Sequence, residues 1–238
     1  MKALLQKALA KLGLKLIKIP KPINHEMINI FIDDEFEEIF KSNNFVFADI
    51  GARGGIPNEW KVFEKYLKVI AFEPDIDAYE ELLKIGNQNT TYFNIALFNK
   101  KSSLKINITR GGGQSSIFNP NRDFLDKFHE LPTNRWDVVK TDKIITDKLD
   151  NILKENDIID LDYIKIDTQG SEEKILEGAI DICKESVLAL EVELFFLQCY
   201  QNQPVFSDVD SLLSKNGFYL FDLRKCYWRR NFIENIRG

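Results

Sequence analysis

The sequence is poor in the residues that build metal centres and disulfide frameworks. Its 238 residues include three cysteines and two histidines. Cys183, Cys199 and Cys226 are widely spaced and form no CxxC pair, so neither a zinc site nor a disulfide scaffold is supported. Cys183 and Cys199 lie in apolar surroundings, where a free cysteine usually behaves as a small hydrophobic residue. We therefore predict buried thiols and no metal ion.

Long apolar runs are also missing. No stretch approaches the roughly 20 apolar residues that a membrane-spanning helix needs. Lysines interrupt every apolar stretch near the N-terminus, which argues against a signal peptide. These absences predict a cytoplasmic protein.

Excess positive charge is a third absence. The formal net charge is −5, from 32 basic and 37 acidic side chains. Six of the basic residues are lysines within residues 1–25, which contain no acid, so the remaining chain has 26 basic against 37 acidic side chains. Such an acidic body does not attract a phosphate backbone, and we expect no nucleic-acid partner.

Residues 2–19 have the periodicity of a helix. Leucines and an isoleucine recur every three or four residues on one face, a second stripe carries four lysines, and Pro20 and Pro22 end the pattern. A basic amphipathic helix of this kind either contacts the inner face of a membrane or packs on protein with its lysines solvated. We assign residues 1–40 to this helix and a linker, and residues 41–238 to the main domain.

From residue 45 onward, strand-like and helix-like patterns alternate. Apolar runs predict strands at residues 45–50, 69–73, 91–97, 104–109, 161–167 and 187–195, and helical spacing appears at residues 57–67, 76–85, 171–178 and 206–215. Residues 120–140 read as a loop with one short helix, and residues 218–223 and 227–233 read as a terminal hairpin. The alternation predicts an α/β domain in which helices cover both faces of a mostly parallel sheet.

The ends of the first two strands carry the signal for a ligand. Ligands of open parallel sheets bind beyond the carboxyl ends of the strands. The first strand ends in Asp49, Gly51, Gly54 and Gly55, a spacing that differs from GxGxxG. A carboxylate at Asp49 would repel a diphosphate, but it suits an ammonium group such as that of the methionine part of S-adenosylmethionine.

Glu73 ends the second strand, 22 residues after Gly51. A carboxylate at about this interval can accept both hydroxyl protons of a ribose. Taken singly, the glycines also fit a plain turn, and Glu73 also fits the start of a helix. Together they favour a cofactor that contains adenosine.

Later strands end in acidic residues as well. Asp167 follows an apolar run that contains Lys165, which we expect to face solvent; Asp167 would either lie beside the cofactor or cap the next helix. Glu191 and Glu193 alternate on the following strand, which places them on one face. An acid pair on a buried strand needs partners or lines a cleft.

At these residues the sequence resembles the FkbM family of methyltransferases that use S-adenosylmethionine. The similar stretches are FADIGARGGIPNEW (47–60), IAFEPD (70–75), NIAL (94–97), DYIKIDTQGSEEKILEGA (162–179) and ALEVEL (189–194). The resemblance runs from about residue 45 to residue 225. It implies a Rossmann-like class I methyltransferase fold, with a mostly parallel seven-stranded sheet whose last strand is antiparallel.

The resemblance also implies a set of cofactor-binding residues. The methionine part would be held near Asp49 and the following loop, and the ribose by Glu73. The adenine would lie beside Pro74 and Asp75, with Asn94 and Ala96 nearby. The implied residues are Asp49, Gly51, Ala52, Arg53, Gly54, Gly55, Glu73, Pro74, Asp75, Asn94, Ala96 and Asp167. Arg53-Gly54-Gly55 departs from the Asn-x-Gly that many members carry. The Gly111–Ser116 loop falls where members often have a Gly/Ser loop near the reacting centre.

The implied reaction is O-methylation of a hydroxyl on a sugar, glycan or secondary metabolite. A hydroxyl acceptor must lose its proton, so a nearby base is needed. Asp167 is the first candidate base, with Glu193 and His129 as alternatives, although His129 also fits a surface histidine without a role.

Two alternatives stay open. An NAD-dependent oxidoreductase or epimerase would use a related sheet, but the GxGxxG loop and a Tyr-x-x-x-Lys pair are missing. A non-catalytic member would bind a nucleotide-like ligand, or a partner through the basic helix.

Overall fold

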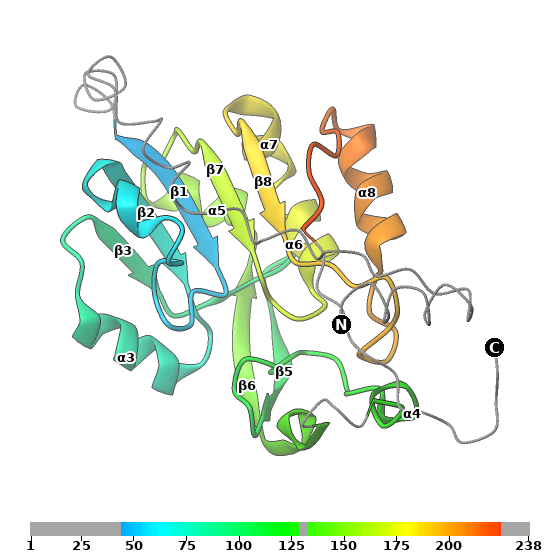
Figure 1. Ribbon diagram of the computed structural model, residues 1–238. Coiled ribbons are helices and arrows are strands. Elements are labelled where there is room, and N and C mark those ends of the chain that lie inside the picture. Colours follow the sequence, from blue (N-terminus) through cyan, green and yellow to red (C-terminus); the bar gives the residue numbers. More distant parts are fainter. Residues whose placement is uncertain (1–43, 129–132, 225–238) are drawn as a thin grey trace, which may run out of the picture. The chain divides into compact units, whose positions relative to one another are not determined.

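The computed structural model describes residues 44–128 and 133–224, which belong to one unit, Asn44–Gly238. Five parallel strands form its central sheet, in the order β3-β2-β1-β7-β8 (Figure 1). The strands are β1 (Phe45–Ile50), β2 (Leu67–Phe72), β3 (Thr90–Phe93), β7 (Tyr163–Ile166) and β8 (Ala189–Val192). The chain moves outward from β1 in one direction and then returns to add β7 and β8 on the other side. This reversal creates a crevice at the carboxyl ends of β1 and β7.

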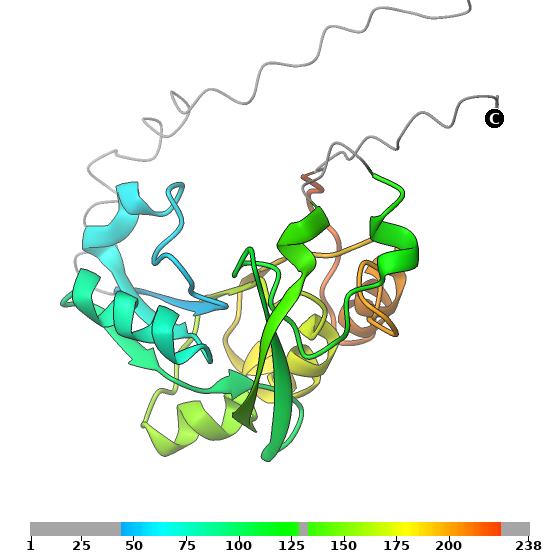
Figure 2. The ribbon, with the colours of Figure 1, turned by 90° about the horizontal axis from the view of Figure 1, so that it is seen from below.

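Alternating side chains of the strands build a separate core on each face of the sheet. Phe47 on β1 belongs to one core, together with Leu82 of helix α3 (Ile76–Ile85) and the partly buried Phe63 of the 3-10 helix Lys61–Tyr66. Ile50 belongs to the other core, which receives side chains from α5 (Leu149–Glu155), α6 (Glu172–Glu177), α7 (Ile180–Glu185) and α8 (Phe206–Lys215). Figure 2 shows α3 and α5 on opposite sides of the sheet. The predicted α/β fold with helices on both faces is confirmed.

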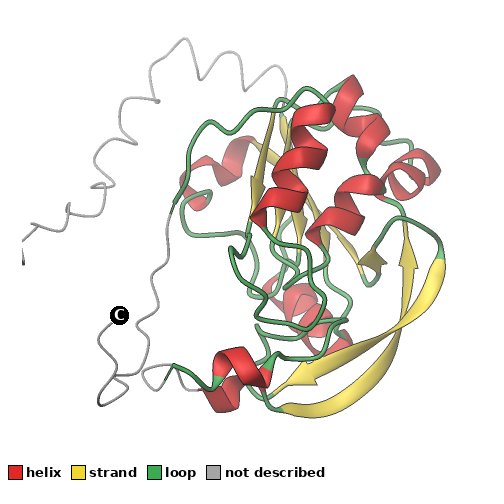
Figure 3. Cartoon of the chain, turned by 90° about the vertical axis from the view of Figure 1, so that its right-hand side faces the viewer, coloured by secondary structure: helices red, strands yellow, loops and turns green. Residues whose placement is uncertain are grey.

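A second, smaller sheet is inserted between β3 and α5. It consists of β4 (Ala96–Leu97), β5 (Ser102–Thr109) and β6 (Val138–Asp147) in the order β4-β6-β5, with β5 and β6 antiparallel. Figure 3 shows β5 and β6 as two long strands outside the parallel sheet. The segment between them contains α4 (Arg122–Leu125) and the 3-10 helix Thr133–Trp136.

Three expectations about secondary structure need correction. The parallel sheet has five strands in the described part of the chain, rather than seven with an antiparallel last one. Residues 218–223 form no strand, and Tyr219 and Phe221 are exposed instead of packed in a sheet. Residues 227–233 lie outside the described residues. The strand β6 was not expected, because residues 138–141 are exposed and only its second half carries buried side chains.

The structure also reports on two features of the composition. Cys183 and Cys199 are free and buried, as predicted. Within the described ranges, no helix has the length and apolar character needed to cross a membrane. The predicted amphipathic helix at residues 2–19 and the predicted domain boundary near residue 40 lie outside the described residues.

Candidate functional site

A cavity lies at the carboxyl ends of β1, β2 and β7. The small sheet forms part of its wall through Leu104, Ile106 and Ile144, and the loop that follows β5 contributes Gly112 to Ile117. Seven of the residues predicted to bind the cofactor lie on the wall: Gly51, Arg53, Glu73, Pro74, Asp75, Ala96 and Asp167. The structure therefore brings together residues from strand ends that are far apart in the sequence.

Gly51 is required by the close approach of two strands. Its φ is +85°, and a Cβ atom there would lie 2.0 Å from the carbonyl oxygen of Asp167. The same approach is fixed by a hydrogen bond of 2.9 Å from the Asp167 N–H to the Ile50 carbonyl oxygen. The sequence suggested that the glycine makes room for a ligand, whereas in the structure it makes room for the end of β7.

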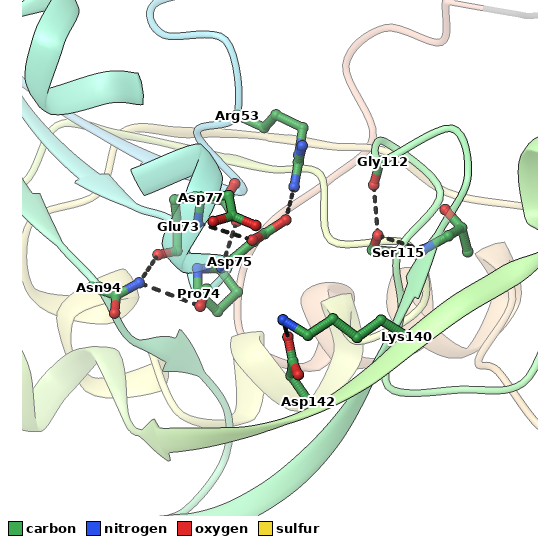
Figure 4. Close-up of polar contacts among 11 residues, drawn as sticks. Arg53, Glu73, Pro74, Asp75, Asp77, Asn94, Gly112, Ser115, Lys140 and Asp142 are labelled. Atoms are coloured by element: carbon green, nitrogen blue, oxygen red, sulfur yellow. Dashed lines mark hydrogen bonds and ion pairs between the residues drawn. The ribbon is translucent and has the colours of Figure 1, made fainter. Parts of the chain in front are cut away.

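Glu73 is a buried carboxylate on the cavity wall. Its residue is 5% exposed, and its Oε1 accepts a hydrogen bond of 2.9 Å from the Asp75 N–H. The Asn94 Nδ2 donates to the carbonyl oxygens of Glu73 and Pro74, at 2.9 and 3.3 Å, which holds this turn in place (Figure 4). Burial raises the pKa of Glu73, and the hydrogen bond from Asp75 opposes this rise. Asn94 thus shapes the turn and does not line the cavity.

Arg53 reaches across the cavity mouth. Its guanidinium forms an ion pair with the Asp75 carboxylate. The Arg53 Nη1 also lies close to Gly112 in the loop after β5: a Cβ atom added to Gly112 would be 3.0 Å from this nitrogen. That loop is held by the Ser115 Oγ, which donates to the Gly112 carbonyl oxygen at 2.7 Å (Figure 4). The arginine that departs from the usual family pattern therefore links the β1 loop, the turn after β2 and the small sheet.

Asp49 does not lie on the cavity wall. It is 2% exposed, and its Oδ1 lies 3.3 Å from the Nζ of Lys165, its register partner on β7. Burial raises the pKa of Asp49, and Lys165 opposes this rise. The expectation that Lys165 faces solvent is wrong, since its side chain is 17% exposed and also lies 4.0 Å from the Asp167 carboxylate. The role of Asp49 toward a ligand ammonium stays a prediction.

Asp167 and Glu193 form a carboxyl pair at the ends of β7 and β8. The Gln169 Nε2 donates to both, at 3.0 Å from the Asp167 Oδ1 and 2.5 Å from the Glu193 Oε2. Loss of solvent around its carboxyl group, followed by the hydrogen bond with Asp167, raises the pKa of Glu193 to about 8, although the residue as a whole is exposed. Gln169 thus joins the two carboxyl groups into one pair, in which Asp167 is the candidate base.

The remaining candidates are placed elsewhere. Glu191 accepts hydrogen bonds from the Tyr163 hydroxyl at 3.1 Å and from the Arg224 guanidinium at 2.6 Å, so it is separate from the Asp167 pair. His129 lies outside the described residues. Ala52, Gly54 and Gly55 do not line the cavity. Asp167 does not cap helix α6, whose N-cap is Ser171.

The sequence matches the family described as the Methyltransferase FkbM domain over residues 49–220. The chain belongs to the FkbM methyltransferase family. The matched range contains every residue of the cavity wall described above. No curated protein and no solved structure matches the chain. Membership in this family makes the protein a methyltransferase and favours this class over an oxidoreductase.

Within residues 44–128 and 133–224, no group of three His, Cys, Asp or Glu side chains is placed to hold a metal ion. Carboxylate and amide side chains of Glu73, Asp167 and Gln169 line the cavity of this FkbM-family protein.

Proposed function

We propose that the protein transfers a methyl group from S-adenosylmethionine to a hydroxyl of a small molecule or glycan. The observation that carries this proposal is Glu73, a buried carboxylate on the wall of a cavity at the carboxyl ends of parallel strands. Among the described residues it forms no ion pair with a lysine or arginine side chain; the Asp75 N–H donates to its Oε1, and Arg53 lies near enough to lower its pKa. A carboxylate kept in this state is suited to accept hydrogen bonds from the two hydroxyls of a ribose.

The other residues of the cavity fit an adenosine. Ile95, Leu97 and Phe98 give apolar surface beside Glu73, as a planar base requires. Ala96 and Asp75 line the same cavity. A carboxylate next to an apolar slot matches a ligand that has a polar sugar and an aromatic base.

The chain supplies position and a proton acceptor. Bound S-adenosylmethionine would supply a methyl group on a positively charged sulfur and would leave as the neutral thioether. Asp167 would take the proton that the acceptor hydroxyl loses, so that charge balances. Most of the rate enhancement would come from holding the acceptor oxygen in line with the methyl group.

The uncharged hydrogen-bonding residues of the cavity wall support a neutral, hydroxyl-bearing acceptor. They are Ser115, Ser116, Thr168 and Gln169. Sugars and hydroxylated metabolites present the matching groups. A strongly anionic acceptor would instead meet the carboxylate of Asp167.

Calorimetric titration with S-adenosylmethionine, S-adenosylhomocysteine and NAD tests the proposal. We expect saturable binding of the first two, at least tenfold weaker binding in Glu73→Ala, and normal binding in Glu81→Ala, which removes an exposed glutamate of α3. Binding of NAD alone would overturn the methyltransferase assignment of this cavity. Equal affinities in both variants would show that Glu73 does not hold the ligand.

A separate proposal concerns residues 1–19, whose basic amphipathic pattern suits an anionic membrane surface. The protein should then sediment with vesicles that contain anionic lipid, and deletion of residues 1–19 should abolish this. Sedimentation that survives the deletion would contradict the proposal.

A further inference from the structure

Gln169 is held in an unusual backbone conformation by a distant loop. Its φ is +59°, a region that residues other than glycine rarely adopt. The Ser116 Oγ donates to its carbonyl oxygen at 2.6 Å, across 53 residues of sequence. Such strain persists only where the surrounding structure fixes it, and it is often found at functional sites.

The Tyr200 hydroxyl holds the side-chain amide of Gln169 through its oxygen. The ring of Tyr200 is completely buried, and its hydroxyl lies 3.0 Å from the Gln169 Oε1 and 2.9 Å from the Gln114 carbonyl oxygen. The hydroxyl has one proton, which it can share between these two acceptors; the amide oxygen of Gln169 faces Tyr200, and the amide nitrogen faces the two carboxyl groups. A flipped amide would place its oxygen against two carboxyl groups.

The amide nitrogen of Gln169 therefore meets both members of the carboxyl pair. Its two protons are directed to Asp167 and Glu193, at 3.0 and 2.5 Å. Both residues follow strand ends, and Gln169 joins their side chains. Gln169 is the one side chain of the described residues that donates to both.

We propose that Gln169, anchored by Tyr200 and Ser116, is a positioning residue that aligns the Asp167 and Glu193 carboxyl groups for the removal of the acceptor proton. This rests on the proposed function, since it assigns Asp167 as the base. The bridge holds the two carboxyl groups side by side, with Asp167 on the cavity wall. Gln169 itself does not exchange a proton with the acceptor.

Several other titratable groups surround the pair. Loss of solvent around its carboxyl group, its contact with Asp167 and the charge of Glu172 on α6 raise the pKa of Glu193, whereas the Gln169 hydrogen bond lowers it. The Nζ of Lys165 on β7 lies 4.0 Å from the Asp167 carboxylate. From the segment after β8, the thiol of Cys199 and the hydroxyl of Tyr200 face the pair, and burial keeps both neutral by raising the pKa of each.

Loss of the Gln169 amide donor should change the pKa of Glu193 in a defined direction. Gln169→Met keeps the length of the side chain but removes the hydrogen bond that stabilises the Glu193 carboxylate. We therefore expect the pKa of Glu193 to rise from about 8, by about one unit. Tyr200→Phe leaves the amide in place but frees its orientation, so the rise should have the same sign and be smaller.

Carbon-13 NMR of protein labelled at the glutamate side-chain carboxyl groups measures this directly. The carboxyl that titrates near pH 8 is assigned to Glu193 if it disappears in Glu193→Gln, and thermal unfolding checks that each variant is folded. An upward shift in Gln169→Met, or in Tyr200→Phe if the first does not fold, supports the proposal. An unchanged titration in both, or a wild-type Glu193 that titrates near its ordinary value, overturns it.

Calorimetric titration of the same variants with S-adenosylmethionine separates this proposal from the proposed function. Retained binding with a shifted titration supports a role in proton positioning. A shifted titration in a protein that never binds S-adenosylmethionine would refute the proposed function but leave the Gln169 bridge established.

Discussion

Replacement of Lys165 by methionine should destabilise the protein strongly. The lysine Nζ lies 3.3 Å from Asp49, a carboxylate that is 2% exposed, and 4.0 Å from Asp167. Methionine fills a similar volume without charge, so the main effect is an unpaired buried carboxylate. Breaking a buried pair in this way costs about 3–5 kcal/mol. Since the Lys165 side chain is 17% exposed, we expect about 3 kcal/mol, or a fall in Tm of about 6–12 °C.

The loss should depend on pH. Burial already raises the pKa of Asp49, and removal of Lys165 raises it further. The folded variant then binds a proton at Asp49 that the unfolded chain does not bind, so its stability falls as pH rises through this window. The destabilisation should therefore be smaller at pH 5 than at pH 8, as measured by urea unfolding at both values.

Two controls make this prediction sharp. Lys68→Met makes the same change at an exposed position of β2 and should cost less than about 0.5 kcal/mol. Addition of Asp49→Asn to Lys165→Met removes the unpaired charge and should recover part of the stability. A loss below about 1 kcal/mol for Lys165→Met, with no dependence on pH, would refute the argument that Lys165 neutralises Asp49.

Two further predictions concern packing and thiol chemistry. Gly51→Ala should lower the free energy of unfolding by more than about 3 kcal/mol in thermal or urea unfolding, because its Cβ would lie 2.0 Å from a backbone oxygen. Gly54 has a similar positive φ but open space around it, so Gly54→Ala should cost only about 1 kcal/mol. Equal losses in the two variants would contradict the assigned clash. In a Cys226→Ser variant, Cys183 and Cys199 should react with a thiol reagent at pH 8 only after the protein is unfolded. Burial raises the pKa of both thiols to about 12, so neither is ionised at that pH. Rapid reaction in the folded state would show that the two thiols are accessible.

The elements that alternate most regularly were predictable from the sequence. Strand β1, helix α3 and helix α8 lie within a residue or two of their expected bounds, because their apolar residues follow a single period. Glu73 was also predictable, since both the interval from Gly51 and its place at a strand end are local features. The family match then covers this whole part of the chain.

The features that were missed depend on contacts between distant residues. Lys165 reads as solvent-facing because its partner Asp49 is 116 residues away. Gln169 lies in a loop, and its anchors are 53 and 31 residues away in two unrelated segments. Strand β6 carries charged residues, and its first four residues are exposed. The segment at residues 218–223 has the local pattern of a strand, yet a strand also needs a neighbour to pair with, which no local pattern reports.

The small sheet has a consequence for how new activities arise on this scaffold. The segment between β5 and β6 forms one wall of the cavity and also holds the loop after β7, because the Ser116 Oγ donates to the Gln169 carbonyl oxygen. Exchange of this segment with that of another family member would remodel that wall without changing Glu73, but only an insert that keeps Ser116 would also keep Gln169 in place. Variation of this wall is therefore constrained at the one serine that anchors the β7 loop.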